Sequence, residues 1–330
     1  MSSLLTNSSA MTALQTLSMT NKNMATTQNR ISTGLRVNDA ADNAAYWSIA
    51  TTMRSDVGAL SAVQDSLGLG AATLDVTFTA INSTVDTLNE IKEKLVAAKG
   101  QTDSGREKIQ EDISNLQKQL ETYANSAVTS SGDNWLVRDP ATQDMQPDVV
   151  GSFTRNSDGS TRIEQITVDL ANVFLIDSAA DTGLLDSDMV ADLQVAADAA
   201  ATADGGTPPV DISRLTGGTA SILTIDISNL DESANDKYVV DGLVAVVDQK
   251  IAALTDAATT IGSSKKRVDS QMDFVKALSD SYTRGIGQLV DADMNAESTR
   301  LQALQTQQQL GIQALSIANQ GAQNILSLFR

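Results

Sequence analysis

Few side chains in this sequence could carry acid–base, nucleophilic or metal chemistry. The 330 residues contain no histidine and no cysteine, which excludes thiolate nucleophiles, disulfides and imidazole or thiolate metal ligands. Two acidic pairs remain, Asp186 with Asp188 and Asp231 with Glu232. Calcium prefers carboxylate ligands, but no ligand loop surrounds either pair, so we expect both to face solvent. The sequence therefore predicts no catalytic residue, no metal site and no cofactor.

One catalytic alternative stays open, because carboxylates alone can do acid–base work. Its place would be the acidic stretch 179–221. This stretch is short and contains no aromatic residue, whereas ligand pockets are lined mainly by hydrophobic and aromatic side chains. We therefore expect a structural protein rather than an enzyme.

Charge is distributed very unevenly along the chain. The formal net charge is −18, and residues 131–250 contain 6 basic and 21 acidic side chains. An acidic surface repels nucleic acid and anionic lipid, so neither is an expected partner. All four prolines lie between 140 and 209, which leaves both ends of the chain free to form long helices.

Neither end has the pattern of a membrane or signal segment. Residues 1–21 carry no positive charge and no long apolar run, which argues against a cleavable secretion signal. Residues 301–329 are uncharged but contain eight glutamines and two asparagines, too polar for a bilayer core. We expect no membrane insertion.

Hydrophobic periodicity predicts the helices that hold this chain together. Residues 1–35 are predicted to form an amphipathic helix with one apolar stripe, which includes Leu14. The longest series of apolar residues spaced by seven, the run of sevens, follows this helix. The stripe is Ala10, Leu17, Met24 and Ile31, and the long run is Met53, Leu60, Leu67, Leu74, Ile81, Leu88 and Leu95. A helix over 53–98 would be about 70 Å long. A break is expected at 32–39, after which Asp39 or Asp42 could cap the new helix.

A reversal is expected at Gly100–Gly105, followed by a second packed helix. Its apolar positions are Ile109, Ile113, Leu116, Leu120, Tyr123 and Ala127. Residues 149–170 read as a β-hairpin with Asn156–Gly159 at its tip. We expect a short helix at 184–200 and a strand at 222–227. Helix returns at about 236 and continues to the C-terminus.

Both ends carry few charges and offer helical seams that need a partner. The simplest solution packs the N-terminal helix against the C-terminal helix, and then molecule against molecule. Seams of small and amide residues bury little apolar area, so we expect the ends to be disordered in the monomer and to order on assembly.

Two end segments resemble the terminal signatures of bacterial flagellins. They are Asn29–Ala45, which reads NRISTGLRVNDAADNAA, and Ala318–Arg330, which reads ANQGAQNILSLFR. Tyr46–Ala50 and Trp135 look most like the rhizobial group. The resemblance covers about 1–178 and 222–330, and 179–221 has no clear counterpart.

The resemblance implies a secreted, mainly α structural subunit of the flagellar filament, exported unfolded and polymerised into a propeller. A hook–filament junction protein is the alternative, because it shares the terminal design. By this likeness, 1–44 and 286–330 form an inner-tube coiled coil. Segments 45–178 and 222–285 form a helical rod with the hairpin, and 179–221 forms a small mixed outer domain.

The residues of the helical seams take their roles from this likeness. The polymerisation core is Leu14, Leu17, Met24, Ile31, Leu301, Leu304, Leu315, Ile325 and Leu328. The connector between inner and outer helices is Arg30, Arg36, Asn38 and Asp39. The rod packs through Leu60, Leu67, Leu74, Ile81, Leu88, Leu95, Ile113, Leu116 and Leu120.

Flagellin partners follow by the same resemblance: copies of this chain, other flagellins, an export chaperone, and cap and junction proteins. Host receptors read two stretches, 88–97 in animals and 28–50 in plants. Recognised members carry arginine where this chain has Glu90, and Asn43, Tyr46 and Trp47 also depart from the usual pattern. Reversing a charge weakens a complementary contact, so we expect weak recognition by both receptors.

Overall fold

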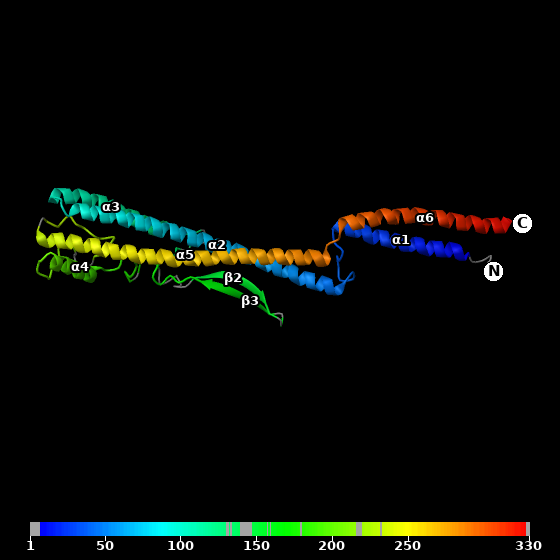
Figure 1. The fold of residues 1–330 in the computed structure, drawn as a ribbon, viewed down its shortest axis with the longest axis horizontal. Helices are drawn as coiled ribbons and strands as arrows, with labels where there is room; N and C mark the ends of the chain where they lie inside the picture. The colour runs from blue at the N-terminus through cyan, green and yellow to red at the C-terminus, as the bar shows by residue number, and fades with distance from the viewer. Residues whose placement is uncertain are drawn as a thin grey trace. The chain divides into compact units, whose positions relative to one another are not determined.

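A computed structural model gives the fold of most of the chain (Figure 1). It describes residues 7–129, 132, 134–138, 147–156, 158, 160–178, 180–215, 220–231 and 233–327, with side chains up to 320. The helices are α1 (Ser8–Thr33), α2 (Ala44–Ala98), α3 (Asp103–Ser126), α4 (Val190–Ala203), α5 (Ala234–Val290) and α6 (Met294–Ser327). The strands are β1 (Val137–Arg138), β2 (Asp148–Arg155), β3 (Thr161–Thr167) and β4 (Ile176–Asp177). The mainly α fold with a β-hairpin is confirmed.

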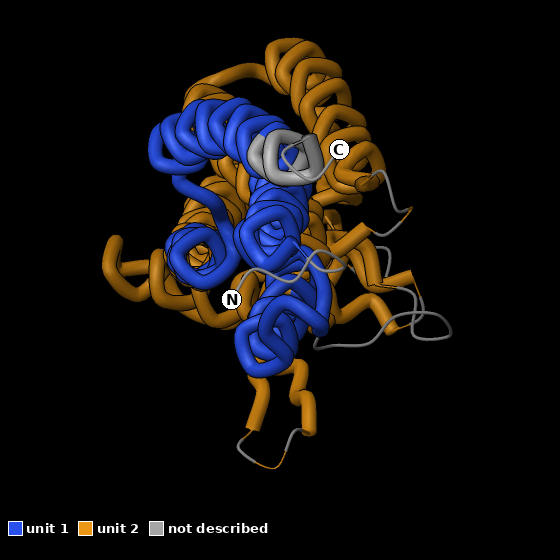
Figure 2. Tube along the Cα trace, turned by 90° about the vertical axis from the view of Figure 1, so that its right-hand side faces the viewer, with its two compact units in different colours: residues 1–59, 277–330 blue, residues 60–276 orange. Residues whose placement is uncertain are grey.

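The chain forms two compact units, coloured separately in Figure 2. Unit 1 contains residues 1–59 and 277–330, the two ends of the chain. Unit 2 contains residues 60–276. These limits differ from the inner, rod and outer parts expected from the sequence, whose boundaries stay a prediction.

Three long helices run side by side in unit 2 (Figure 1): α2, α3 and α5. The run of sevens supplies the core, because Leu67, Leu74, Ile81, Leu88 and Leu95 are all fully buried. Lys94 of α2 pairs with Asp112 of α3 at 2.5 Å, and Lys92 of α2 pairs with Asp248 of α5 at 2.6 Å. The apolar residues spaced by seven thus form the core between the three helices, and charged pairs lie at its surface.

The stretch after β4 packs on the long helices. Gly242 of α5 lies so close to α4 that a Cβ there would meet the backbone nitrogen of Ala197 at 2.9 Å. The Gln117 side chain, almost buried in α3, donates to the carbonyl oxygens of Ile222 and Ile225, both at 3.0 Å. These contacts hold α4 and residues 220–227 against α5 and α3.

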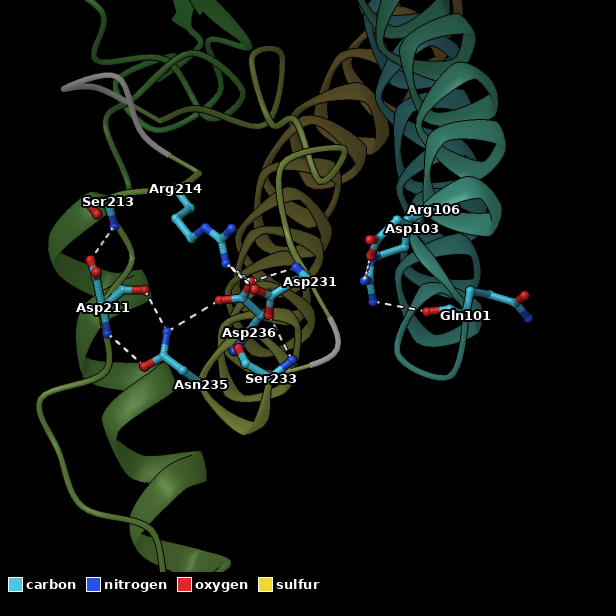
Figure 3. A network of polar contacts seen from close by, with 10 residues as sticks. All are labelled: Gln101, Asp103, Arg106, Asp211, Ser213, Arg214, Asp231, Ser233, Asn235 and Asp236. Carbon is cyan, nitrogen blue, oxygen red and sulfur yellow. Dashed lines mark hydrogen bonds and ion pairs between the residues drawn. The ribbon is translucent and has the colours of Figure 1, made fainter.

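A polar network fixes the start of α5 (Figure 3). The Asp236 carboxylate, buried in the first turn, accepts hydrogen bonds from Arg214 at 3.0 Å and from the backbone nitrogen of Asp231 at 2.6 Å. Arg214 also holds the pKa of Asp231 far below its usual range. Asn235 donates to the carbonyl of Asp211 at 2.9 Å. The segment around residue 212 is therefore tied to the helix N-terminus, where negative charge is favoured.

The β-hairpin pairs β2 and β3 antiparallel, with Val149 opposite Ile166 and Arg155 opposite Thr161. The register shifts between Val150 and Ser152, so Gly151 forms a bulge. Val149 packs on α2 at Gly70, where a Cβ would lie 2.5 Å from a Val149 methyl. The absence of a side chain at Gly70 thus lets the hairpin approach α2.

Several local expectations were wrong. Residues 222–227 form turns and extended loop rather than a strand, because their backbone bonds go to α3 side chains. Asn43, and not Asp39 or Asp42, caps α2: its side chain accepts from the backbone nitrogens of Ala45 and Tyr46. The expected continuous C-terminal helix breaks at 291–293, between α5 and α6.

Asp186 gives a pH-dependent prediction. Burial raises the pKa of its carboxyl, whose Oδ1 has no hydrogen-bond partner within the described residues, while Oδ2 accepts from the Asp177 backbone nitrogen at 2.6 Å. A raised folded-state pKa means that the charged form costs stability above that pKa, and that this cost disappears as pH falls through it. Asp186→Asn should therefore raise the melting temperature at pH 7.

This gain should shrink as the pH falls toward 3.8, the ordinary pKa of an aspartate side chain. Thermal unfolding by circular dichroism between pH 3.5 and about 7 measures it. Asp65→Asn, at an exposed position on α2, controls for the loss of one negative charge. Equal melting temperatures for Asp186→Asn and the parent protein at neutral pH would contradict the prediction.

Candidate assembly interface

The two ends of the chain pair as antiparallel helices in unit 1 (Figure 1). Three contacts give the direction. Asn7 donates to the carbonyl of Ala318 at 2.9 Å, Gln308 donates to Asn21 at 2.9 Å, and Arg30 pairs with Glu297 at 3.0 Å. Residue numbers fall along α6 as they rise along α1. The two helices are therefore antiparallel, although they lie at opposite ends of the sequence.

Little apolar surface is buried between α1 and α6. Thr20, Thr27 and Leu304 are buried, and the Thr20 hydroxyl is satisfied by the carbonyl of Thr16 at 3.0 Å. Leu17 contacts α6 at Gly311, where an added Cβ would lie 3.4 Å from its Cδ1. Small and hydroxyl-bearing residues at the seam let the helices approach closely but contribute little hydrophobic stabilisation.

The predicted polymerisation residues divide into two groups. Leu17, Met24, Ile31, Leu301 and Leu315 are half-buried and Leu304 is buried. Leu14, by contrast, is 60% exposed, and with Leu17 it lines a shallow depression on α1. The Ile325 side chain and Leu328 lie outside the described residues.

Large apolar side chains remain exposed on both end helices. On α1 they are Met11, Leu14 and Met19, and on α6 they are Met294, Leu310, Ile312 and Ile317. Ile317 is 69% exposed and Met11 is 65% exposed. Single exposed apolar residues are ordinary, but a concentration on two paired helices marks an interaction surface.

Two arginines of the predicted connector join the halves of unit 1. Arg30 pairs with Glu297, whose side chain is only 11% exposed, in the first turn of α6. A carboxylate there also interacts favourably with the helix dipole. Arg36 donates to the carbonyls of Gln288 and Leu289, at 3.3 and 3.0 Å. These are orphan carbonyls of the last turn of α5, which Arg36 caps.

Backbone contacts reinforce this junction. The Arg36 nitrogen donates to Val290 at 2.6 Å, and Ala292 donates to Gly34 at 2.9 Å. Gly34 ends α1 with a φ of 73°, a conformation that favours glycine. A small apolar cluster covers the bonds, formed by Leu35, Val37, Ala50, Ile286, Leu289 and Val290.

The other two predicted connector residues act locally. Asp39 accepts from the nitrogens of Ala41 and Asp42, at 2.8 and 3.2 Å, forming a turn. Asn38 donates its backbone nitrogen to Asp42 at 2.9 Å. In the described part of the chain, neither side chain forms a hydrogen bond to another segment. They shape the loop before α2, whereas Arg30 and Arg36 make the long-range contacts.

Sequence reasoning missed the acidic side of the junction. Glu297 lies opposite Arg30, and Asp293 caps α6 by accepting from Asn295 and Ala296, at 2.9 and 3.2 Å. The signal was present, because an N-cap aspartate together with an acidic residue in the first turn is typical of a helix start. The apolar repeat continues through this position, so it predicted one continuous helix and no helix start.

The remaining candidates lie as follows. Among the rod residues, Leu60, Ile113 and Leu120 are buried and Leu116 is half-buried. Glu90 is exposed on α2, and Tyr46 is 41% exposed in its first turn. Asn43 is half-buried and serves as the cap described above. In the described part of the chain, no helix is long and apolar enough to cross a membrane.

Removing the Arg36 side chain should weaken unit 1. We expect Arg36→Ala to lower the free energy of unfolding by about 1 kcal/mol, because two charge-assisted bonds to the end of α5 are lost while the backbone bond stays. Arg36→Lys should restore only part of this, since an ammonium lacks the guanidinium fork.

Urea unfolding and amide hydrogen exchange at the end of α5 measure the effect. Arg54→Ala, at an exposed arginine of α2, should leave both unchanged. Identical exchange near residue 290 in Arg36→Ala and the parent protein would show that the cap is unimportant.

Comparison with known proteins agrees with this arrangement. Residues 4–138 match the family described as the bacterial flagellin N-terminal helical region, and residues 244–329 match the bacterial flagellin C-terminal helical region. The chain is 42% identical to Flagellin A and 45% identical to Flagellin C, both of Rhizobium meliloti strain 1021. It is 42% identical to a flagellin of Brucella melitensis. Each alignment covers 100% of both chains.

Proposed function

The chain belongs to the bacterial flagellin family and is a structural subunit of the extracellular flagellar filament, and we propose that α1 and α6 form its polymerising core. In this proposal the antiparallel pair becomes the inner tube, and Arg30 and Arg36 hold it to the helices that follow. Residues 45–178 and 222–285 form the rod, and residues 179–221 face outward.

The observation that carries the proposal is the number of exposed apolar side chains on the end helices. Leu14 and Ile317 are 60% and 69% exposed, although the helices that bear them are already paired with each other. Within one molecule nothing else among the described residues covers them. Contacts with further copies would remove this surface from water, and non-closing contacts of this kind generate open filaments.

Negative-stain microscopy of purified monomer tests the proposal. Full-length protein should form long filaments on its own, and versions lacking 1–44 or 286–330 should not. Deletion of 179–221 should leave assembly intact. A hook–filament junction protein, the alternative reading, would not form long filaments alone, so absence of filaments from the full-length chain would favour it.

Other partners follow from the way such a subunit must reach its place. An export chaperone would cover the end helices before secretion in the unfolded state, and cap and junction proteins would contact the same surfaces. Other flagellins can share the filament, since related chains present related end helices. Co-purification of a chaperone with full-length chain, lost on removal of 286–330, would support this part.

Weak recognition by host receptors is also part of the proposal. Glu90 is exposed on α2 and presents a negative charge where recognised flagellins carry a positive one. Asn43 is committed to capping α2, and Tyr46 occupies the first turn. Receptor-activation assays with purified monomer test the idea, and a full-strength response in either assay would sink it.

A further inference from the structure

The α2–α5 contacts in unit 2 follow one strict register. Lys92 pairs with Asp248, and Lys99 pairs with Asp241 at 2.8 Å. In each pair the two residue numbers add up to 340, as expected for antiparallel helices that stay in step. Asp75 pairs with Lys265, and Phe78 contacts Gly262, and both of these pairs also add up to 340.

Most of this seam repeats every seven residues and so cannot fix its own register. The buried leucines of α2 are seven apart, and so are the two lysines and their two aspartates. Sliding α5 by one heptad in either direction replaces one leucine or isoleucine by another on the α2 side. It also re-forms one ion pair, either Lys92 with Asp241 or Lys99 with Asp248.

Four residues break this repetition. Asp75 and Lys265 form an ion pair of reversed polarity, with the acid on α2 and the base on α5. One turn away, Phe78 lies against Gly262, where a Cβ would be in ordinary van der Waals contact with Phe78 Cε2, at 3.5 Å, and a larger side chain would extend beyond that contact.

A slip of one heptad destroys both contacts. Phe78 would face Thr255 or Asp269, and Lys265 would face Gly68 or Asn82. The ring would then meet a side chain instead of a glycine, and the reversed ion pair would have no equivalent.

We propose that Asp75, Phe78, Gly262 and Lys265 form a register lock that selects one alignment of α2 and α5 among those the heptad repeat allows. An exposed ion pair adds little to stability, but specificity depends on the difference between competing states. The lock raises the free energy of the slipped alignments relative to that of the observed alignment. This inference concerns folding of the subunit and stands whether or not the proposed polymer contacts are correct.

Distances between spin labels test the lock, and the absence of native cysteine makes labelling straightforward. Val96 and Ser270 are exposed on α2 and α5. In the observed register Val96 faces position 244, so labels on Val96→Cys and Ser270→Cys should lie about 40 Å apart. A slip of one heptad moves α5 by about 10 Å, which gives about 30 or about 50 Å.

Three variants in this background distinguish the lock from the rest of the seam. Phe78→Ala/Lys265→Asp should add a population at about 30 or about 50 Å. Asp75→Lys/Lys265→Asp, which swaps the charges, should keep the single distance. Lys92→Asp, which breaks a repeating pair, should also keep it.

A fourth variant moves the acid by one heptad. Asp75→Asn/Asn82→Asp with Phe78→Ala conserves charge and offers Lys265 a partner in the slipped register, so a population at about 30 Å should appear. The proposal is overturned if Phe78→Ala/Lys265→Asp keeps its helical circular dichroism and a single distance near 40 Å. Should that variant unfold, the moved-acid variant decides: a single unshifted distance there overturns the lock.

Discussion

The variant Leu14→Asp is expected to fold like the parent protein and to form no filaments. Leu14 is 60% exposed on α1, so a charged side chain there stays in water in the monomer, and the free energy of unfolding should change by less than about 0.5 kcal/mol. In a polymer that covers this position, an unpaired carboxylate would be buried at every subunit contact, a cost of several kcal/mol each.

Urea unfolding measures the first half of this expectation, and sedimentation with negative-stain microscopy measures the second. Val195→Asp is the matched control: Val195 is 71% exposed on α4, in the part proposed to face outward. It carries the same change in chemistry and should assemble normally. Filaments from Leu14→Asp at the parent's critical concentration would show that α1 is covered on some other face.

Replacing Gly242 by alanine is expected to destabilise unit 2 by about 1 to 3 kcal/mol. The added methyl would lie 2.9 Å from the backbone nitrogen and 3.1 Å from the Cα of Ala197. Backbone atoms cannot rotate away, so α4 must shift off α5. This cost exceeds the gain of about 1 kcal/mol that alanine normally brings to a helix interior.

Gly68→Ala is the same substitution, but the expected change in the free energy of unfolding has the opposite sign. Gly68 lies inside α2 and has open space where its Cβ would be, so helix propensity alone should raise stability by about 1 kcal/mol. Equilibrium urea unfolding of both variants gives the comparison. If Gly242→Ala were also stabilising, α4 would have to be a loosely held element rather than a packed one.

Close packing of α4 also bears on the stretch 179–221, which the sequence describes poorly. Its alanines and aspartates give no strong periodicity, yet Leu193, Ala197 and Ala201 are buried on one face of α4. Two helices can approach closely only where their facing residues are small. The alanine-rich sequence of α4, which predicts no particular fold, therefore packs closely against α5 at Gly242. Nothing in residues 190–203 alone names that glycine.

The sequence by itself determined the helical framework and the family of this protein. Leucines at intervals of seven specify a buried face wherever the chain is helical, and Leu67 to Leu95 are buried as a result. The absence of histidine and cysteine, the low charge of both ends and the acidic middle are all read directly from the sequence. Two terminal signatures identified the flagellin family, because such signatures are local and need no tertiary contact to be read.

Tertiary structure alone decided which faces meet and in what alignment. Leu14 and Leu17 belong to one apolar stripe, but Leu17 is half-buried and contacts Gly311 of α6, whereas Leu14 is 60% exposed. The sequence places Arg36 in a loop. In the folded chain it donates hydrogen bonds to two carbonyls at the end of α5. A seven-residue period repeats itself after every slip, so it states that a face is apolar without stating its partner. That choice depends on contacts between segments more than 180 residues apart, such as Phe78 against Gly262.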